Sequence, residues 1–189
     1  MIIFAVQTNI ELSKKPEWLD AFRSKYGDLR YDYHVTLKQP WVISEKQIPE
    51  IREKLSSFFG QASVHPMHLT FNTIVLASTK VDQADGCIMI KSEDNEQINK
   101  LQENIVGVLS IYKEYVEPES KEYEEQFMPH ITIAWNLDAE KFKLAEKELK
   151  QDYFCEGEVT KVILSIIRNF DHKDKSKGVH NDSEYILTK

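Results

Sequence analysis

The sequence predicts an α+β protein with a mostly antiparallel sheet, and two observations lead to this fold class. Segments typical of strands alternate with amphipathic helical segments, and one strand pair is joined by a turn too short for a crossover helix. In addition, the order helix, strand, helix occurs twice, at 15–60 and at 93–151, and each of these strands contains His-x-Thr. The repeat predicts two pseudo-symmetric lobes with helices on their outer faces and a central cleft.

The predicted helices show end signals or an apolar stripe. Pro16 lies near the first turn of the first helix and Gly27 near its end, where these residue types are favoured. Ser44 is a cap candidate for the second helix, which repeats apolar residues at helical spacing, as the third helix also does. The predicted helices are 15–27, 44–60, 93–112 and 138–151.

The predicted strands are short runs rich in β-branched and aromatic residues. Asp85 and Gly86 mark the turn of the one short hairpin. The predicted strands are 2–8, 34–40, 67–78, 87–92, 130–135, 158–168 and 184–189. The acidic stretch 114–125 and the charged loop 169–183 are predicted as solvated connections. In the second of these, residues 171–180 are alternatively a flap that supplies a cation to phosphate.

Length and composition are those of a globular protein, with 189 residues, 41% of them hydrophobic and 29% charged. We expect a single bilobal domain over residues 1–189. The net charge of −7 argues against an extended nucleic-acid interface, which needs many cations facing phosphates. It still permits a phosphate site made of one or two cations and a few hydrogen-bond donors.

The sequence also predicts a cytoplasmic protein that holds no metal or cofactor. No apolar run approaches the roughly 18 residues of a membrane-spanning helix, and the first ten residues are typical of a strand and not of a signal peptide. Cys87 and Cys155 lie in strand-like runs without a CxxC motif, so we expect buried, reduced thiols. His65 and His68 lack an HExxH motif, so a surface or strand-edge role is expected for both.

The tetrad HVTL at residues 34–37 recurs as HITI at residues 130–133. A strand has a period of two, so the His and Thr of each tetrad point to one face, about 6.6 Å apart along the strand. The two aliphatic residues point to the other face, toward a core beneath the flanking helices. If the lobes are related by a pseudo-two-fold axis, both polar faces meet across the cleft.

Two histidines and two threonines facing one another are suited to cleave a phosphodiester. An unperturbed imidazole titrates near pH ~6.5, so His34 and His130 can act as base and acid on opposite sides of the phosphorus atom. The hydroxyls of Thr36 and Thr132 can donate to the non-bridging oxygens, where negative charge develops. A single His-x-Thr is usually part of a solvated sheet face, but two copies at matching positions in a repeat favour the functional interpretation.

At these residues the chain resembles the two-histidine (2H) phosphoesterase superfamily, which includes bacterial RNA 2',3'-cyclic phosphodiesterases, also called 2'-5' RNA ligases. The signature of that family is a duplicated His-x-Thr/Ser-x, and Pro129 precedes the second copy here as it does in many relatives. The resemblance implies a bilobal α+β fold in which one lobe contains both termini. It also implies that His34 and His130 are the catalytic pair and that Thr36 and Thr132 bind phosphate.

The resemblance implies a metal-independent phosphodiesterase acting on a 2',3'-cyclic phosphate or a 2'-5' phosphodiester. The acidic chain lacks an Arg-rich loop, so a nucleotide or a short RNA end is the expected substrate and no partner protein is indicated. One alternative is RNA 2'-5' ligation, in which a 2'-hydroxyl competes with water as the nucleophile at the same site. Another is a non-catalytic nucleotide- or RNA-binding module of the same fold. The sequence leaves open which histidine is the acid, and also the oligomeric state.

Further cleft candidates are Lys38, Trp41 and Arg168. Lys38 has the same strand parity as His34 and Thr36, and its alternative is a solvated strand end. Trp41 follows Pro40 and is alternatively a packing residue, which is also the expectation for Trp135 because its parity matches the core side. Two other aromatic residues, Tyr31 and Tyr33, precede the first tetrad and are either core residues or a platform for base stacking.

Overall fold

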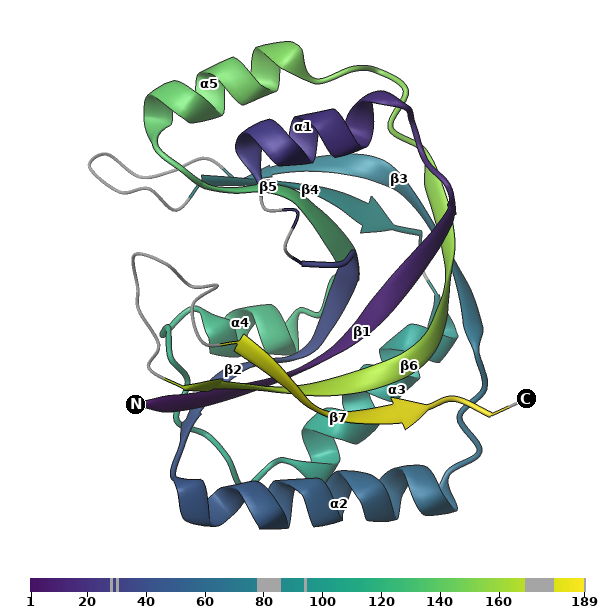
Figure 1. Cartoon of the computed structure of the whole chain (residues 1–189), viewed down its shortest axis with the longest axis vertical. Helices are drawn as coiled ribbons and strands as arrows, with labels where there is room; N and C mark the ends of the chain where they lie inside the picture. The colour runs from purple at the N-terminus through teal and green to yellow at the C-terminus, as the bar shows by residue number, and fades with distance from the viewer. Residues whose placement is uncertain (28, 30, 78–85, 94, 169–178, 189) are drawn as a thin grey trace.

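The computed structural model describes residues 1–27, 29, 31–77, 86–93, 95–168 and 179–188. Within these residues the strands form one antiparallel sheet in the order β2-β1-β6-β3-β4-β5, and β7 pairs with β6 outside that path. The predicted α+β class with an antiparallel sheet is confirmed (Figure 1). The strands are β1 Ile2–Lys14, β2 His34–Ile43, β3 Met67–Ala77, β4 Gly86–Ser92, β5 His130–Leu137, β6 Cys155–Arg168 and β7 Val179–Ile186.

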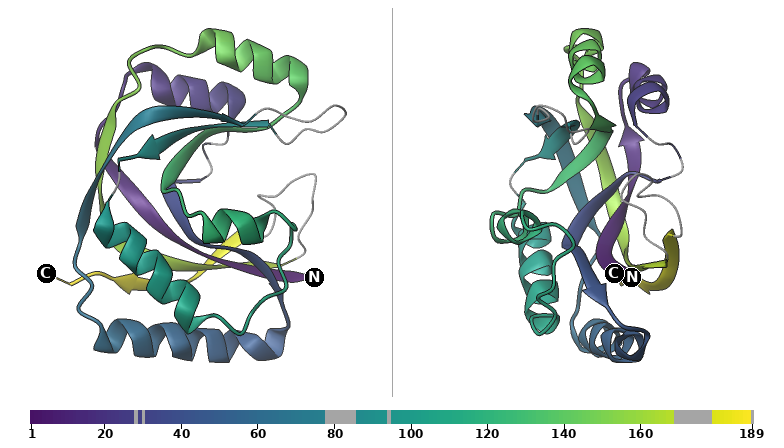
Figure 2. Two further views of the ribbon diagram at one scale, coloured as in Figure 1. Left: turned by 180° about the vertical axis from the view of Figure 1, so that it is seen from behind. Right: turned by 90° about the vertical axis from the view of Figure 1, so that its left-hand side faces the viewer.

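The four predicted helices are present and flank the motif strands as expected, and α4 is a further short helix that the sequence did not predict. They are α1 Trp18–Tyr26, α2 Ile48–Gln61, α3 Glu96–Val108, α4 Ser120–Glu125 and α5 Ala139–Glu148, and a 3-10 turn at Glu45–Gln47 precedes α2. Helices α1 and α5 lie at one end of the molecule, and α2 and α3 lie at the other (Figures 1 and 2). Strand β1 begins and β7 ends in the half that carries α2. Pseudo-symmetry of two lobes, and one bilobal domain over 1–189, stay predictions.

Strands β2 and β5, which carry the tetrads, stand at opposite ends of the strand order. Six strands in a flat sheet place the first and last about 24 Å apart, at about 4.8 Å per spacing. Here the sheet is strongly bent, and β2 and β5 contact each other (Figures 1 and 2). The bend therefore brings together two edges, and with them two segments nearly one hundred residues apart.

The hydrophobic core lies on the side of the tetrads that carries the aliphatic residues. Val35 and Leu37 of β2 and Ile131 and Ile133 of β5 are at most 1% exposed and belong to this core. Helix α1 contacts β5 directly, and Gly27 at its end makes this possible. A Cβ atom on Gly27 would lie 2.8 Å from the carbonyl oxygen of Ile133, closer than any side chain tolerates.

The acidic stretch 114–125 is not a solvated connection, and this prediction was wrong. Its residues 114–116 add to the edge of β2, where Val42 N–H donates to Glu114 O at 2.8 Å and Val116 N–H donates to Pro40 O at 3.1 Å. An edge strand has unpaired backbone groups, and this segment satisfies some of them. Helix α4 then begins at Ser120, and its Glu124 is buried.

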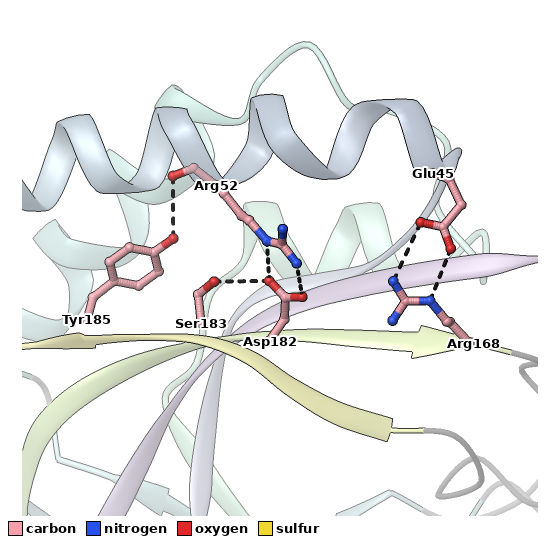
Figure 3. A network of polar contacts seen from close by, with 6 residues as sticks. All are labelled: Glu45, Arg52, Arg168, Asp182, Ser183 and Tyr185. Atoms are coloured by element: carbon pink, nitrogen blue, oxygen red, sulfur yellow. Dashed lines mark hydrogen bonds and ion pairs between the residues drawn. The ribbon is translucent and has the colours of Figure 1, made fainter.

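The charged loop, predicted as 169–183, is also shorter than expected, because residues 179–183 belong to β7 and pair with β6. Residues 169–178, which hold most of the predicted flap, lie outside the described part. Figure 3 shows how β7 is held against α2: the guanidinium of Arg52 forms an ion pair with Asp182, and Tyr185 O–H donates to Arg52 O at 3.5 Å. The Tyr185 ring also stacks on Phe59 of α2, with 4.8 Å between ring centroids.

Candidate active site

His34 and His130 are held in the same way, each by the backbone two residues before it. Nδ1 of His34 lies 3.0 Å from the Asp32 carbonyl oxygen, and Nδ1 of His130 lies 2.7 Å from the Met128 carbonyl oxygen. A carbonyl oxygen only accepts hydrogen bonds, so Nδ1 carries the proton in each ring. In a neutral imidazole this leaves Nε2 as the basic nitrogen, and both rings therefore present the same atom for proton transfer.

The two imidazoles lie within electrostatic range of each other. Burial lowers the pKa of both His34 and His130 below the usual value, because a charged imidazolium is poorly solvated there. The positive charge of His130 lowers the pKa of His34 further, and Arg23 acts in the same direction. This coupling agrees with the contact between β2 and β5, the two strands that carry the histidines.

Thr36 and Thr132 share a face with the histidines, which we call the histidine face: the side of β2 and β5 that carries His34, Thr36, His130 and Thr132. Both threonines are half-buried, whereas their aliphatic neighbours in the tetrads are buried in the core. Each threonine thus keeps part of its surface accessible.

Each tetrad is followed at once by a β-bulge. In β2, Thr36 pairs with Gln7 but Lys38 pairs with Val6, so two residues of β2 advance against one of β1. In β5, Thr132 pairs with Met89 but Ala134 pairs with Ile88, and again two residues advance against one. A bulge shifts the alternation of side chains by one residue. The parity read from the sequence therefore fails directly after each tetrad, and a second register shift further along each strand changes the alternation again.

Lys38 and Trp41 do not line an open surface, and for Lys38 this correction follows from the bulge. Lys38 is 0% exposed, pairs with Glu124, and has its Nζ 3.1 Å from the centroid of the Trp41 ring. Trp41 is 1% exposed and lies in the core, opposite Phe4, after a second register shift. Burial lowers the pKa of Lys38 to about 8 despite its hydrogen bond to Glu124.

Glu124 is the centre of a buried polar network that connects the two tetrad regions. Its carboxylate accepts from Lys38 Nζ at 2.9 Å, from Gln39 N–H at 3.2 Å and from Tyr115 O–H at 3.2 Å. The side chain of Gln102 in α3 donates to its carbonyl oxygen at 3.2 Å. Lys38 follows the first tetrad and Glu124 precedes the second, so the network ties one motif strand to the segment that leads into the other.

Trp135 is not a core residue, because the bulge in β5 turns it to the histidine face. Ala134 is buried opposite Ile88, and the next side chain, Trp135, is half-buried. Its ring contacts that of Tyr31, with 6.4 Å between centroids, and Tyr31 in turn lies 6.2 Å from the ring of His34. An aromatic pair therefore adjoins the first histidine.

Arg168 lies far from the tetrads. Arg168 pairs with Ile2 of β1, whereas His34 pairs with Asn9 of the same strand. Ile2 and Asn9 are seven positions apart, which is about 23 Å of extended chain. Its guanidinium Nε donates to Glu45 at 3.0 Å, as Figure 3 shows. Arg168 therefore holds the end of β6 near α2 and does not reach the histidine face.

Three further residues emerge only from the strand pairing and helix packing. Lys91 of β4 pairs directly with His130, so its exposed side chain stands on the same face as the imidazole. Asn9 pairs with His34 in the same way, and its amide donates to the carboxylate of Asp32 at 3.0 Å. Buried Arg23 donates to Tyr31 O at 2.8 Å and so supports the segment before His34.

The remaining histidine and cysteine predictions have mixed outcomes. His65 and His68 are both exposed, as expected, and His65 Nδ1 lies 2.8 Å from Thr188 O. In the described part of the chain, His, Cys, Asp and Glu do not gather in a group that could hold a metal ion. Cys155 is buried, as predicted, whereas Cys87 is only half-buried. None of the described helices is long and apolar enough to span a membrane.

A family model described as "2'-5' RNA ligase superfamily" matches residues 12–169, a stretch that contains both tetrads. The chain belongs to the 2'-5' RNA ligase superfamily. This confirms the resemblance drawn from the duplicated His-x-Thr motif.

One relative and several solved structures are also similar to this chain. The chain is 29% identical over 125 residues to a protein of Geobacillus sp. (strain WCH70) that is provisionally named a phosphoesterase. That match spans 64% of this chain and 62% of the relative's length. E. coli LigT in complex with NADP+ superposes with a TM-score of 0.56 at 15% identity, covering 100% of this chain and 97% of LigT.

Two other solved structures share the fold. Usb1 of Kluyveromyces marxianus has a TM-score of 0.55 at 8% identity, with 98% of each chain covered. TT0787 of Thermus thermophilus has a TM-score of 0.55 at 16% identity, covering 99% of this chain and 98% of TT0787. At such identities the likeness concerns the fold.

Proposed function

We propose that this member of the superfamily is a metal-independent phosphodiesterase that acts on a 2',3'-cyclic phosphate or a 2'-5' phosphodiester. The observation that carries the proposal is the matched orientation of His34 and His130, which both hold Nδ1–H on a carbonyl and leave Nε2 for proton transfer. If His34 and His130 had only structural roles, they would not both need to carry the proton on Nδ1.

In the proposed reaction, Nε2 of one neutral histidine accepts a proton from the attacking water, whose oxygen forms the new bond to phosphorus. The other histidine enters protonated and donates its Nε2 proton to the leaving sugar oxygen as the old P–O bond breaks. Thr36 and Thr132 donate hydrogen bonds to the non-bridging oxygens as their negative charge grows. The protons balance, because one histidine gains the proton that the other loses.

A nucleotide or a short RNA end is the proposed substrate. LigT was crystallised with NADP+ and with ATP, so a protein of this fold holds nucleotides. The net charge of −7 disfavours a long polyanion, since affinity for one grows with the number of phosphates neutralised by Lys and Arg.

A second candidate is RNA 2'-5' ligation, which the description of the matching family favours. In ligation, a sugar hydroxyl takes the place of water and attacks the 2',3'-cyclic phosphate: its oxygen forms the new bond to phosphorus while one P–O bond of the ring breaks. The same two histidines can serve this step, one accepting the proton of the hydroxyl and the other protonating the leaving sugar oxygen. A third candidate is a binding module without turnover. It does not explain why both histidines carry the proton on the same ring nitrogen.

The test is a product assay in EDTA with 2',3'-cyclic nucleotides, a 2'-5'-linked oligoadenylate and a 3'-5'-linked control. His34→Ala and His130→Ala are each expected to remove most of the activity while leaving the thermal unfolding midpoint near that of the parent. His68→Ala is the matched control, because His68 is an exposed histidine outside the site. Activity that EDTA removes and zinc restores would contradict the proposed mechanism.

A further inference from the structure

We propose that Lys91 and Thr73 form a second-phosphate site, which selects substrates that carry a further phosphate on the His130 side of the reacting phosphorus. The inference rests on the proposed function and deepens it, because it takes the reacting phosphate to lie between His34 and His130 and names the group that lies next to it. The strand register, the accessibility of Lys91 and the charges on either side of the histidines support it.

One row of side chains crosses three strands of the sheet. His130 of β5 stands opposite Lys91 of β4, and Lys91 stands opposite Thr73 of β3. Directly opposed residues of antiparallel strands point to the same face, with Cβ atoms about 4.5–5.5 Å apart. In the next row, Ile131 and Ile90 are 0% exposed and belong to the hydrophobic core on the other face. Lys91 and Thr73 therefore continue the histidine face from β5 onto β4 and β3.

The ammonium group of Lys91 is open to a ligand. Lys91 is exposed, and among the residues that the structure describes it has no ion-pair or hydrogen-bond partner. Glu93, two positions further along, does not pair with it, because the Glu93 carboxylate accepts from Thr70 O–H and from the amide of Asn72. Lysines that protect a sheet edge do not explain Lys91 either, since β4 lies between β3 and β5. The position suits a cation that binds an anion.

Thr73 supplies a hydrogen-bond donor beside this charge. Thr73 is exposed, and its hydroxyl donates to Asn72 Oδ1 at 3.1 Å. A hydroxyl hydrogen rotates about its C–O bond, so the same donor can turn to the oxygen of a phosphate held between Thr73 and Lys91. An ammonium group binds phosphate through charge-assisted hydrogen bonds, which are roughly twice as strong as neutral ones.

The position of Lys91 relative to both histidines indicates which phosphate it holds. Strands β5 and β2 contact each other, with β4 on the outer side of β5 and β1 on the outer side of β2. The side chains therefore follow one another in the order Lys91, His130, His34 and Asn9. In-line displacement places the incoming and leaving oxygens along the line between the histidines. Lys91 lies beyond His130 by one strand spacing, about 4.8 Å, so it faces the group attached at that end and not the reacting phosphate.

The two ends of this row differ in charge, which gives the substrate a direction. At the His34 end, Asn9 stands where the other end has its lysine, and the Asn9 amide donates to the carboxylate of Asp32 at 3.0 Å. Asp32 is exposed, whereas Arg23, which also acts on His34, is buried. An additional phosphate is therefore attracted to the lysine end, and the exposed carboxylate disfavours it at the other.

Stable nucleotides measure the second-phosphate site without turnover. The probes are adenosine 2'-monophosphate and 3'-monophosphate, each compared with the same nucleotide carrying a further 5'-phosphate. Isothermal titration calorimetry of the parent protein gives the Kd of every probe. In at least one of the two pairs we expect the bisphosphate to bind roughly tenfold or more tightly, because one charge-assisted contact is added.

A further probe identifies the source of the second phosphate. It is a dinucleotide that ends in the same 2'- or 3'-phosphate, so that its linking phosphodiester replaces the terminal 5'-phosphate of the bisphosphate. Affinity equal to or higher than that of the bisphosphate indicates an RNA end as the ligand. Affinity between those of the monophosphate and the bisphosphate indicates a small nucleotide with a terminal phosphate.

Three variants separate the charge of Lys91 from a structural role. Lys91→Gln keeps most of the side-chain length and is expected to remove most of the advantage of the bisphosphate, while the Kd of the monophosphate stays nearly unchanged. Lys91→Arg keeps the cation and should retain the advantage, and Thr73→Val should lose part of it. Lys14→Gln is the matched control, because Lys14 is an exposed strand lysine at the far end of β1, with its Nζ 4.7 Å from the centroid of the Phe154 ring.

The outcomes distinguish this inference from the proposed function. Equal binding within both pairs, no binding of any probe, or an undiminished advantage in folded Lys91→Gln would each overturn the second-phosphate site. The product assay decides the phosphodiesterase activity independently. Activity that depends on both histidines, together with no advantage for a bisphosphate, would uphold the proposed function and remove this inference alone. An advantage that depends on Lys91 in a protein without turnover would uphold the site and contradict only the proposed reaction.

Discussion

The Nζ of Lys38 lies 2.9 Å from Oε1 of Glu124, with the two side chains 0% and 4% exposed. A charged pair so fully removed from water is stable only where both partners stay, because either one alone is a buried, uncompensated charge. Here the pair joins β2, just beyond the first tetrad, to α4, just before the second. We call this pair a brace, because it links the first motif strand to the segment that leads into the second.

Breaking this brace is expected to destabilise the protein strongly. Lys38→Met leaves Glu124 charged and without its main partner, at a cost of about 3–5 kcal/mol in the free energy of unfolding. Adding Glu124→Gln removes the stranded charge, so the double variant should recover much of that loss. Urea denaturation of both variants measures the difference. Glu148→Gln, which breaks the exposed pair with Lys25, is the control and should leave the midpoint unchanged. A Lys38→Met variant as stable as the parent would contradict the brace.

The pH dependence of activity follows from the two lowered histidine pKa values. Catalysis needs one neutral and one protonated histidine, so kcat/KM is bell-shaped, rising as the base loses its proton and falling as the acid loses its own. Burial lowers both pKa values of the free enzyme, so the maximum of kcat/KM is expected below pH ~6.5. Bound phosphate stabilises the imidazolium, and the kcat profile should therefore lie at higher pH. A maximum of kcat/KM above about pH 8 would refute this assignment.

The electrostatic coupling of the histidines can be observed directly. His130→Gln removes a positive charge, so the pKa of His34 is expected to rise toward its ordinary value. Titration of the imidazole ¹⁵N signals by NMR measures this shift, and the same spectra of the parent at high pH should show Nδ1 protonated in both rings. His68→Gln serves as the control. An unmoved His34 pKa would place the two imidazoles too far apart for one phosphate.

Two glycines offer a matched test of the contact between α1 and β5. Gly27→Ala places a Cβ atom 2.8 Å from the Ile133 carbonyl oxygen and is expected to lower the free energy of unfolding by about 1–3 kcal/mol. Gly60, in α2, has nothing within 4 Å of the same atom, so Gly60→Ala should stabilise by about 0.5–1 kcal/mol through helix propensity. Thermal or urea denaturation of the pair decides. Equal effects would show that helix α1 can shift away from β5.

Within the site, the sequence alone was enough to find the residues whose neighbours along the chain determine their direction. A strand alternates with period two whatever it pairs with, so the tetrads predicted both the polar face of His34 and Thr36 and the buried face of Val35 and Leu37. The helices on either side followed from apolar periodicity and end signals in the same local way.

The tertiary structure decided what lies one step beyond each tetrad. A bulge is two residues of one strand set against one residue of its partner, and it cannot be seen in either strand's sequence alone. Lys38 was expected at the cleft or at a solvated strand end and is buried, whereas Trp135 was expected in the core and stands on the histidine face. The pairing of Lys91 with His130 and the burial of Glu124 likewise depend on segments far apart in the chain. The sequence determined which residues of each tetrad share a face of their strand. The register and bend of the sheet, which are set by long-range pairing, decided which strands meet and what surrounds the two histidines.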